Sequence, residues 1–187
     1  VSGCTSFDIA TIISLDPDLA VPDFTVVNQC DPTSTAFDIT VRVPNTINTP
    51  RFTLGGDEQL PTIVGGFWEY TYIVSSPGDY VVDVVDANGC TSQGTATVYD
   101  FLSATGEFST DSTCNDADGV ITISTNGGSG DFTFELTGTD YNSNSVGPIT
   151  QTNDPLFTGL TPGTYEVLIT DRVVFDGTIY CFTRVSN

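Results

Sequence analysis

Apolar and polar residues alternate along most of this chain, in short runs separated by Gly, Pro, Asn and Asp. A period of two, with Val, Ile, Thr, Phe and Tyr at the apolar positions, is typical of half-buried β-strands. In the first half the pattern predicts strands at 24–27, 37–43, 51–54, 68–74, 80–85 and 91–98. In the second half it predicts strands at 106–109, 120–124, 132–136, 156–159, 165–170 and 179–185. A short further strand near Thr62 and another near Pro148 bring each set to about seven, and helical periodicity is missing, so the sequence predicts an all-β protein.

Two landmarks recur along the chain at a spacing of about 85 residues, which is the signature of a repeat. Gly-Cys-Thr-Ser occurs at 3–6 and again at 89–92. Pro-Gly-x-Tyr occurs at 77–80 and again at 162–165, each time followed by alternating apolar residues. The chain is therefore expected to hold two copies of one structural unit.

The repeat sets the expected domain organisation. Residues 19–100 and 101–187 are each expected to form an Ig-like or fibronectin III-like β-sandwich, the two arranged head to tail. Residues 1–15 match the stretch that starts at Asn88, so we expect residues 1–18 to form the last strand of a preceding repeat plus a linker. No signal peptide is recognisable at Val1, and we expect an interior fragment of a longer precursor.

Turn residues agree with a sandwich. Tyr80 and Tyr165 follow Pro-Gly at the start of the penultimate predicted strand, where Ig-like sandwiches tie a Tyr hydroxyl back to the backbone. Asn88-Gly89 joins the last two strands of the first unit, and both positions tolerate positive φ, which predicts a two-residue hairpin turn.

Charge narrows the choice of partners. The chain has 24 acidic residues against four arginines, a formal net charge of −20. A phosphate backbone or an anionic lipid surface would be repelled, so nucleic acid is not an expected partner. Apolar runs stay well short of the roughly 20 residues that cross a bilayer, so no direct membrane insertion is expected.

The absence of His, Lys and Met removes most catalytic equipment, including Ser-His-Asp triads, imidazole metal sites and Schiff bases. Paired carboxylates could still hydrolyse a glycosidic bond, and Asp57, Glu58 and Glu69 are the candidates. Short loops between sandwich strands rarely build the cleft that such a pair needs. We therefore expect no enzyme activity.

Aromatic residues gather in one predicted strand. Phe67, Trp68, Tyr70 and Tyr72 could offer a face on which a sugar ring stacks. Alternation along a strand puts part of such a set in the core, which favours a packing role.

Aspartates gather near the expected ends of the units. Asp31, Asp100, Asp171 and Asp176 could supply the oxygen ligands that calcium prefers. No EF-hand loop is present, and with 24 acids such clustering also fits a solvated surface. No cofactor other than calcium is suggested.

Several stretches together resemble a known family. They are Gly-Gly-Ser-Gly-Asp-Phe-Thr-Phe at 127–134, Gly-Leu-Thr-Pro-Gly-Thr-Tyr at 159–165 and Val-Val-Asp-Ala-Asn-Gly-Cys-Thr at 84–91. They are similar to the SprB-type repeat of very large cell-surface proteins of Bacteroidota, among them gliding-motility adhesins exported by the type 9 secretion system. The resemblance also implies an O-glycosylation signal, and Asp-Ser-Thr at 111–113 fits it, with Ser112 as the acceptor. The first unit lacks the Gly-Gly-x-Gly stretch, and the second replaces Ala-Asn-Gly with residues 172–178.

The five cysteines, Cys4, Cys30, Cys90, Cys114 and Cys181, are too widely spaced for a zinc knuckle and indicate disulfides in an oxidising compartment. The resemblance implies pairing within each unit, Cys30 with Cys90 and Cys114 with Cys181. Sandwich geometry gives an alternative, because the cysteines of one unit fall at opposite ends, whereas in a head-to-tail array Cys30 could meet Cys181 across the junction. In that alternative Cys90 and Cys114 would pair with neighbouring units beyond this stretch, and in both cases Cys4 has no partner within it.

The function expected from these features is that of a structural and adhesive repeat segment of a secreted, extracellular filament or adhesin at a bacterial cell surface. Its expected partners are neighbouring repeats of the same chain, other copies in a filament, and surface glycans. A carbohydrate-binding accessory module of a secreted enzyme is the first rival, which exposed coplanar aromatics would favour. A self-assembling extracellular fibre subunit is the second.

Overall fold

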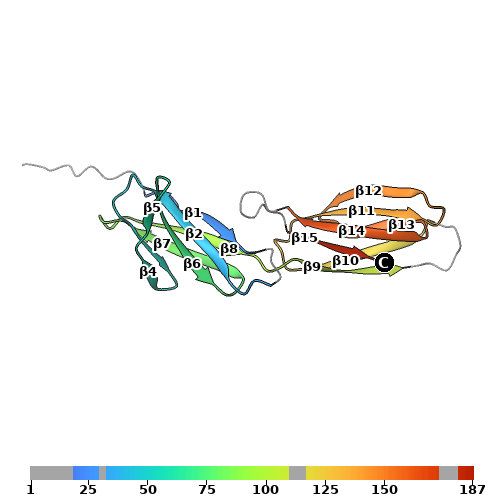
Figure 1. The fold of residues 1–187 in the computed structure, drawn as a ribbon, viewed down its shortest axis with the longest axis horizontal. Helices are drawn as coiled ribbons and strands as arrows, with labels where there is room; N and C mark the ends of the chain where they lie inside the picture. The colour runs from blue at the N-terminus through green and yellow to red at the C-terminus, as the bar shows by residue number, and fades with distance from the viewer. Residues whose placement is uncertain (1–18, 30–32, 110–116, 173–180) are drawn as a thin grey trace, which may run out of the picture.

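The computed structural model describes residues 19–29, 33–109, 117–172 and 181–187. Within these ranges every regular element is a β-strand, and the strands form two lobes that follow one another along the long axis (Figure 1). The predicted all-β class with tandem sandwiches is confirmed. Because residues 1–18 lie outside the described part, the predicted repeat boundaries stay a prediction.

The first lobe, β1 to β8, is a sandwich of two antiparallel sheets. One sheet has the order β1-β2-β6-β5, and the other has the order β4-β3-β7-β8. The strands are β1 (Asp23–Val27), β2 (Phe37–Pro44), β3 (Arg51–Leu54), β4 (Asp57–Gln59), β5 (Thr62–Val64), β6 (Phe67–Val74), β7 (Gly78–Val85) and β8 (Thr91–Val98).

The second lobe, β9 to β15, repeats the arrangement without a counterpart of β5 in its described residues. Its sheets have the orders β13-β10-β9 and β12-β11-β14-β15. The strands are β9 (Ser103–Ser109), β10 (Gly119–Asn126), β11 (Phe132–Asp140), β12 (Ser145–Thr152), β13 (Leu156–Leu160), β14 (Gly163–Asp171) and β15 (Phe182–Ser186).

Each lobe has its own core, made by the inward positions of its two sheets. In the first lobe Phe52 lies between the sheets with alternate residues of β2 and β7. In the second lobe Leu136 and alternate residues of β14 do the same. The predicted alternation thus corresponds to real burial, as the buried and exposed positions of β2 show.

The tyrosine corners are confirmed in both lobes. The Tyr80 hydroxyl donates to the Ser76 carbonyl at 2.6 Å, and the Tyr165 hydroxyl donates to the Thr161 carbonyl at 2.6 Å. Each bond spans four residues and fixes the turn before the penultimate strand.

The Asn88-Gly89 turn differs from the prediction. Gly89 alone among its residues has a positive φ, 85°, and the Asp86 amide donates to the Cys90 carbonyl at 3.0 Å. The loop therefore holds three residues, Ala87 to Gly89, and not two. The cause is the Asp86 carboxylate, whose Oδ1 accepts from the Asn88 amide at 2.9 Å and from the Cys90 amide at 2.8 Å.

Candidate functional site

The region that the structure singles out is the junction where the lobes meet. Residues 99–102 lead from β8 into β9 and are held by both lobes. The Tyr99 amide donates to Gln29 Oε1 of the first lobe at 2.7 Å. Leu102 is fully buried in the core of the second lobe, and Tyr99 packs against that same core. The connection is therefore anchored at both ends.

A glycine loop of the second lobe approaches this connection closely. The Gly128 amide donates to the Asp100 carbonyl at 3.0 Å. Gly127 has a φ of 76°, and a Cβ at that position would lie 2.0 Å from the Phe101 carbonyl oxygen. Only glycine tolerates both the backbone conformation and the contact. The Gly-Gly pair of the 127–130 stretch thus has a place in the junction.

Asp171, at the end of β14, holds the same loop through hydrogen bonds to Ser129. The residue is 0% exposed, and its carboxylate accepts from the Ser129 amide at 2.7 Å and from the Ser129 hydroxyl at 2.6 Å. The Asp171 amide donates to the Cys181 carbonyl at 2.8 Å. A buried carboxylate with these partners fixes the glycine loop and the start of β15 relative to β14.

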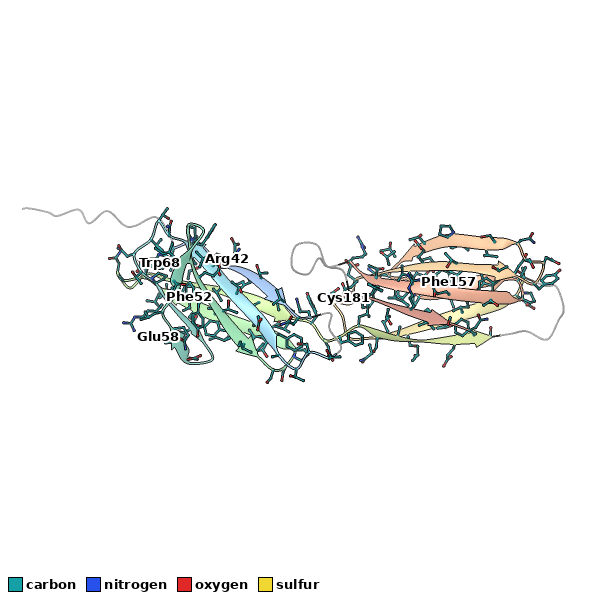
Figure 2. The ribbon with its side chains drawn as sticks, viewed as in Figure 1. Arg42, Phe52, Glu58, Trp68, Phe157 and Cys181 are labelled. Carbon is teal, nitrogen blue, oxygen red and sulfur yellow. The ribbon has the colours of Figure 1, made fainter. Side chains whose placement is uncertain are left out.

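Cys181 lies at the end of the second lobe that faces the first (Figure 2). It is 4% exposed and is one half of a disulfide whose other half lies outside the described residues. Cys90, in contrast, carries a free thiol. The predicted pairing of Cys30 with Cys90 is therefore wrong.

Cys114, the other predicted partner of Cys181, lies outside the described residues, so the pairing of Cys114 with Cys181 stays a prediction.

The calcium candidates stay a prediction. Asp171 is engaged as described, and Asp100 Oδ1 accepts from the Phe101 amide at 2.8 Å. In the described ranges no group of three or more acidic or cysteine side chains could hold a metal ion. Asp31 and Asp176 lie outside those ranges, as does the glycosylation candidate Ser112.

The aromatic residues of β6 do not form an exposed platform. Trp68 Nε1 donates to the Ile47 carbonyl at 3.1 Å, and Tyr72 is buried in the core. The rings of Tyr70 and Tyr72 meet edge to face at 67°, with centroids 4.9 Å apart. Burial, reinforced by the nearby Asp57 carboxylate, raises the pKa of the Tyr72 hydroxyl well above its usual range. Phe67 alone of the four is exposed, at 37%.

The candidate glycosidase carboxylates are each engaged on the strand surface. Glu69 pairs with Arg42 at 2.5 Å, and Glu58 pairs with Arg51. Asp57 Oδ1 accepts from Gln59 Nε2 at 2.7 Å. None of the three lines the pocket described next.

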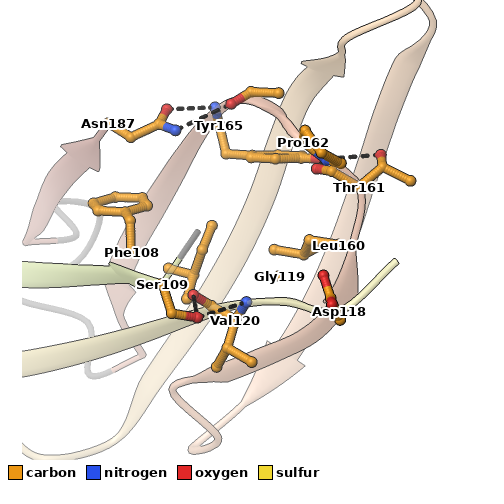
Figure 3. A pocket seen from close by; sticks show the side chains of 12 residues that line it. Phe108, Ser109, Asp118, Gly119, Val120, Leu160, Thr161, Pro162, Tyr165 and Asn187 are labelled. Atoms are coloured by element: carbon orange, nitrogen blue, oxygen red, sulfur yellow. Dashed lines mark hydrogen bonds between the residues drawn. The ribbon is translucent and has the colours of Figure 1, made fainter. Parts of the chain in front are cut away.

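One small pocket lies at the far end of the second lobe (Figure 3). Its walls include Phe108, Leu160, Pro162 and Tyr165. Gly119 pairs with Leu160 there, as Phe37 pairs with Val74 in the first lobe. The pocket thus occurs where the second lobe has glycine in place of a buried phenylalanine. Sequence reasoning missed it, although aligning Gly119 with Phe37 would have pointed to it.

Solved structures that resemble the chain are Ig and fibronectin type III proteins. The ectodomain (Ig1–Ig3) of mouse nectin-like molecule 4 is 14% identical, with 90% of this chain and 63% of that chain covered and a TM-score of 0.37. The four N-terminal Ig domains of Dscam1 are 15% identical, with 80% and 39% covered and a TM-score of 0.38. A two-domain fibronectin type III segment of chicken tenascin is 17% identical, with 89% and 99% covered and a TM-score of 0.34.

The chain spans less than two thirds of the first two of these structures. No protein-family model matches it, and no curated protein matches it. The strand orders agree with the class. In the first lobe the sheet β1-β2-β6-β5 packs against the sheet β4-β3-β7-β8. In the second lobe the sheet β13-β10-β9 packs against the sheet β12-β11-β14-β15. These are the arrangements of sandwiches of the Ig-like and fibronectin type III kind. In the described ranges no helix is long and apolar enough to span a membrane.

Proposed function

We propose that this chain is a structural and adhesive repeat segment of a secreted cell-surface filament, in which the sandwiches serve as spacers. The observation that carries the proposal is the anchored junction. Gln29 of the first lobe accepts a hydrogen bond from the Tyr99 amide of the connection. The Asp100 carbonyl of the connection accepts one from the Gly128 amide of the second lobe. A connection held at both ends resists bending, and a long stalk gains reach from that stiffness.

The disulfide of Cys181 joins the two lobes in this proposal, with Cys30 as its partner. Cys30 directly follows Gln29, whose side chain reaches the Tyr99 amide. Asp100, next to Tyr99, accepts from Gly128, which lies against the Asp171 carboxylate, and Asp171 donates to Cys181. This run of contacts supports a clamp across the junction. A disulfide commonly adds about 2–4 kcal/mol, here to the closed junction.

The site supports a spacer better than its rivals. A carbohydrate-binding module usually presents aromatic rings on one exposed face, whereas Trp68 and Tyr72 are turned inward. The carboxylates that could act in hydrolysis are paired on strands. Membership of the SprB-type repeats, type 9 export and a role in gliding are parts of the proposal that rest on the sequence resemblance.

Two measurements test it. Peptide mapping of the non-reduced chain is expected to find Cys30 linked to Cys181. Small-angle scattering is expected to show a single extended shape, and Cys181→Ser is expected to broaden the distribution of interatomic distances, while Cys90→Ser leaves it unchanged. If both variants match the native profile, the clamp does not stiffen the junction.

Localisation needs its own test. Antibodies raised against the second lobe should label the outer surface of intact cells that make the protein. Labelling only after the cells are broken open would contradict the proposed surface role.

A further inference from the structure

The free end of the first lobe has the same construction as the end of the second lobe that forms the junction. At the junction, Asp171 ends β14, Cys181 precedes β15, and the Asp171 amide donates to the Cys181 carbonyl at 2.8 Å. At the free end, Asp86 follows β7, Cys90 precedes β8, and the Asp86 amide donates to the Cys90 carbonyl at 3.0 Å. Both aspartates are buried.

Strand pairing establishes that these positions are equivalent. Phe52 pairs with Val84 in the first lobe as Phe134 pairs with Ile169 in the second, two residues before Asp86 and Asp171 respectively. The two cysteines therefore occupy the same position of the fold. Yet Cys181 is disulfide-bonded and buried, whereas Cys90 is a free, half-buried thiol.

An uncovered apolar surface lies at the same end of the lobe as Cys90. β2 ends at Pro44, opposite Phe67, and the chain returns at Arg51, opposite Val85. The hairpin at this end exposes Val64 at 48% and Phe67 at 37%, with Ile63 at 56% beside them. A surface of this kind next to an unbonded cysteine is what half of a junction presents before its partner arrives.

We propose that this end face of the first lobe, made by the Asp86–Cys90 turn and the β5–β6 hairpin, docks the far end of another unit of the same kind and is sealed by a disulfide at Cys90. The occupant is the far end of the second lobe of another copy. In the sequence Cys114 follows the end of β9 by five residues, as Cys30 follows the end of β1 by three, and on this basis we assign Cys114 to that end. This inference rests on the proposed clamp between Cys30 and Cys181.

The bond forms by oxidation of two thiols. Each thiol loses a proton and an electron as the S–S bond forms, and oxidised glutathione takes up both protons and both electrons to become two glutathione thiols. A disulfide-containing oxidant of this class supplies the reaction in an oxidising compartment.

A tandem chain tests the inference at a fixed local concentration. Asn187 lies opposite Tyr165, one residue beyond the Glu166–Ser186 pair, as Ala96 lies opposite Tyr80. Ala10 follows Cys4 at the distance that Ala96 follows Cys90. The tandem chain therefore joins residue 187 of a first, full copy to residue 11 of a second copy. The second copy keeps residues 11–18, which precede its first lobe.

The tandem carries Cys90→Ser in the first copy and Cys114→Ser in the second, so that one Cys90 and one Cys114 remain, on opposite sides of the new junction. After refolding with oxidised and reduced glutathione, the non-reduced peptide map is expected to contain Cys90 linked to Cys114. Alkylation is expected to label Cys90 in the single chain and to miss it in the tandem. A control tandem with Cys90→Ser in both copies should leave Cys114 open to alkylation.

The same map separates the two hypotheses. If Cys30 is linked to Cys181 but Cys90 is alkylated, or is bonded to anything other than Cys114, the inference about the end face is overturned and the proposed clamp stands. If Cys30 is not linked to Cys181 in either the tandem or the single chain, the clamp itself is overturned.

Discussion

The two lobes share a strand plan but differ in the loop that faces the preceding unit. In the second lobe this loop is 127–130, and its glycines lie against the connection from the first lobe. In the first lobe the equivalent loop is 45–50, which contains no glycine, and its Asn45 amide donates to the Gly66 carbonyl at 3.1 Å. The lobes therefore cannot receive a neighbour through identical backbone contacts.

This difference separates what is general in the repeat from what is particular to one junction. The buried Asp before the cysteine and the tyrosine corner occur in both lobes. The glycine loop occurs in one. The shared features maintain the sandwich and position the cysteine, whereas the loop fits one particular neighbour.

The largest effect on the free energy of unfolding is expected from replacing one core phenylalanine at a time by alanine. Phe52 and Phe134 occupy equivalent positions, and Phe→Ala in a core commonly costs about 3–5 kcal/mol. Trp68 is the only tryptophan of the chain and lies in the first lobe, so its fluorescence reports that lobe. In urea, Phe52→Ala should lower the free energy of unfolding reported by Trp68 fluorescence by that amount. Phe134→Ala should change the same free energy by less than about 0.5 kcal/mol. A large shift with Phe134→Ala would mean that the lobes unfold as one unit.

The strands that these cores require could be predicted from sequence because burial follows alternation. The polar triplet 57–59 was missed, since β4 has no apolar alternation and forms beyond the turn at Gly55 and Gly56. The Asn88-Gly89 turn was predicted one residue too short, because the Asp86 side chain bonds two amides within the turn.

The junction was largely beyond sequence reasoning because its contacts join distant residues. Gln29 meets Tyr99 across 70 positions, and Ser129 meets Asp171 across 42. Periodicity carries no information on such pairs. The positions of Cys90 and Cys181 before the last strand of each lobe could be anticipated from strand geometry. The role of Gly127 could not, since it depends on how closely Phe101 of the connection approaches.

The next largest effect is expected at the glycine loop, where the chain offers a matched control. Gly127→Ala adds a Cβ 2.0 Å from the Phe101 carbonyl oxygen at a left-handed φ, so we expect a loss of more than about 2 kcal/mol in the second lobe. Gly130 also has a positive φ, 86°, but its Cβ would have open space, and Gly130→Ala should cost about 1 kcal/mol. Urea unfolding followed by far-UV circular dichroism measures both. Equal losses would show that backbone conformation, and not the close approach, requires Gly127.

A smaller effect is expected from the tyrosine corners. Tyr165→Phe and Tyr80→Phe each remove a hydrogen bond of 2.6 Å to a backbone carbonyl, and Tyr165→Phe also removes the bond of 3.3 Å between the Tyr165 and Thr161 hydroxyls. The Tyr165 side chain is buried, whereas Tyr80 is half-buried. The Thr161 carbonyl that loses its donor is therefore less accessible to water than the Ser76 carbonyl of the first lobe. We expect a loss of about 1–1.5 kcal/mol for Tyr165→Phe and about 0.5–1 kcal/mol for Tyr80→Phe by urea unfolding. The reverse order would contradict the assignment of the more buried corner to the second lobe.

The smallest effect concerns a turn of the second lobe that copies the Asp86–Cys90 turn without its cysteine. The Asp140 amide donates to the Asn144 carbonyl at 2.9 Å, and Asp140 Oδ1 accepts from the Asn142 and Asn144 amides at 2.9 and 2.7 Å. The Asn144 side chain adds a bond to Oδ2 at 2.8 Å. The turn geometry alone therefore does not mark a docking site, and it is the cysteine, at the position of Cys181, that distinguishes the free end of the first lobe.

The Asn144 side-chain bond, followed by the Asn144 amide, lowers the pKa of Asp140 below its usual value. Because the folded pKa is lowered, the stabilisation is present above the unfolded pKa and is lost as pH falls through the folded pKa. In a carboxyl NMR titration the pKa of Asp140 should lie below the usual value of an aspartate. Asn144→Ala should move that pKa upward but not fully to the usual value, since the amide bonds remain. An unchanged midpoint would show that the backbone amides of Asn142 and Asn144 alone lower the pKa of Asp140.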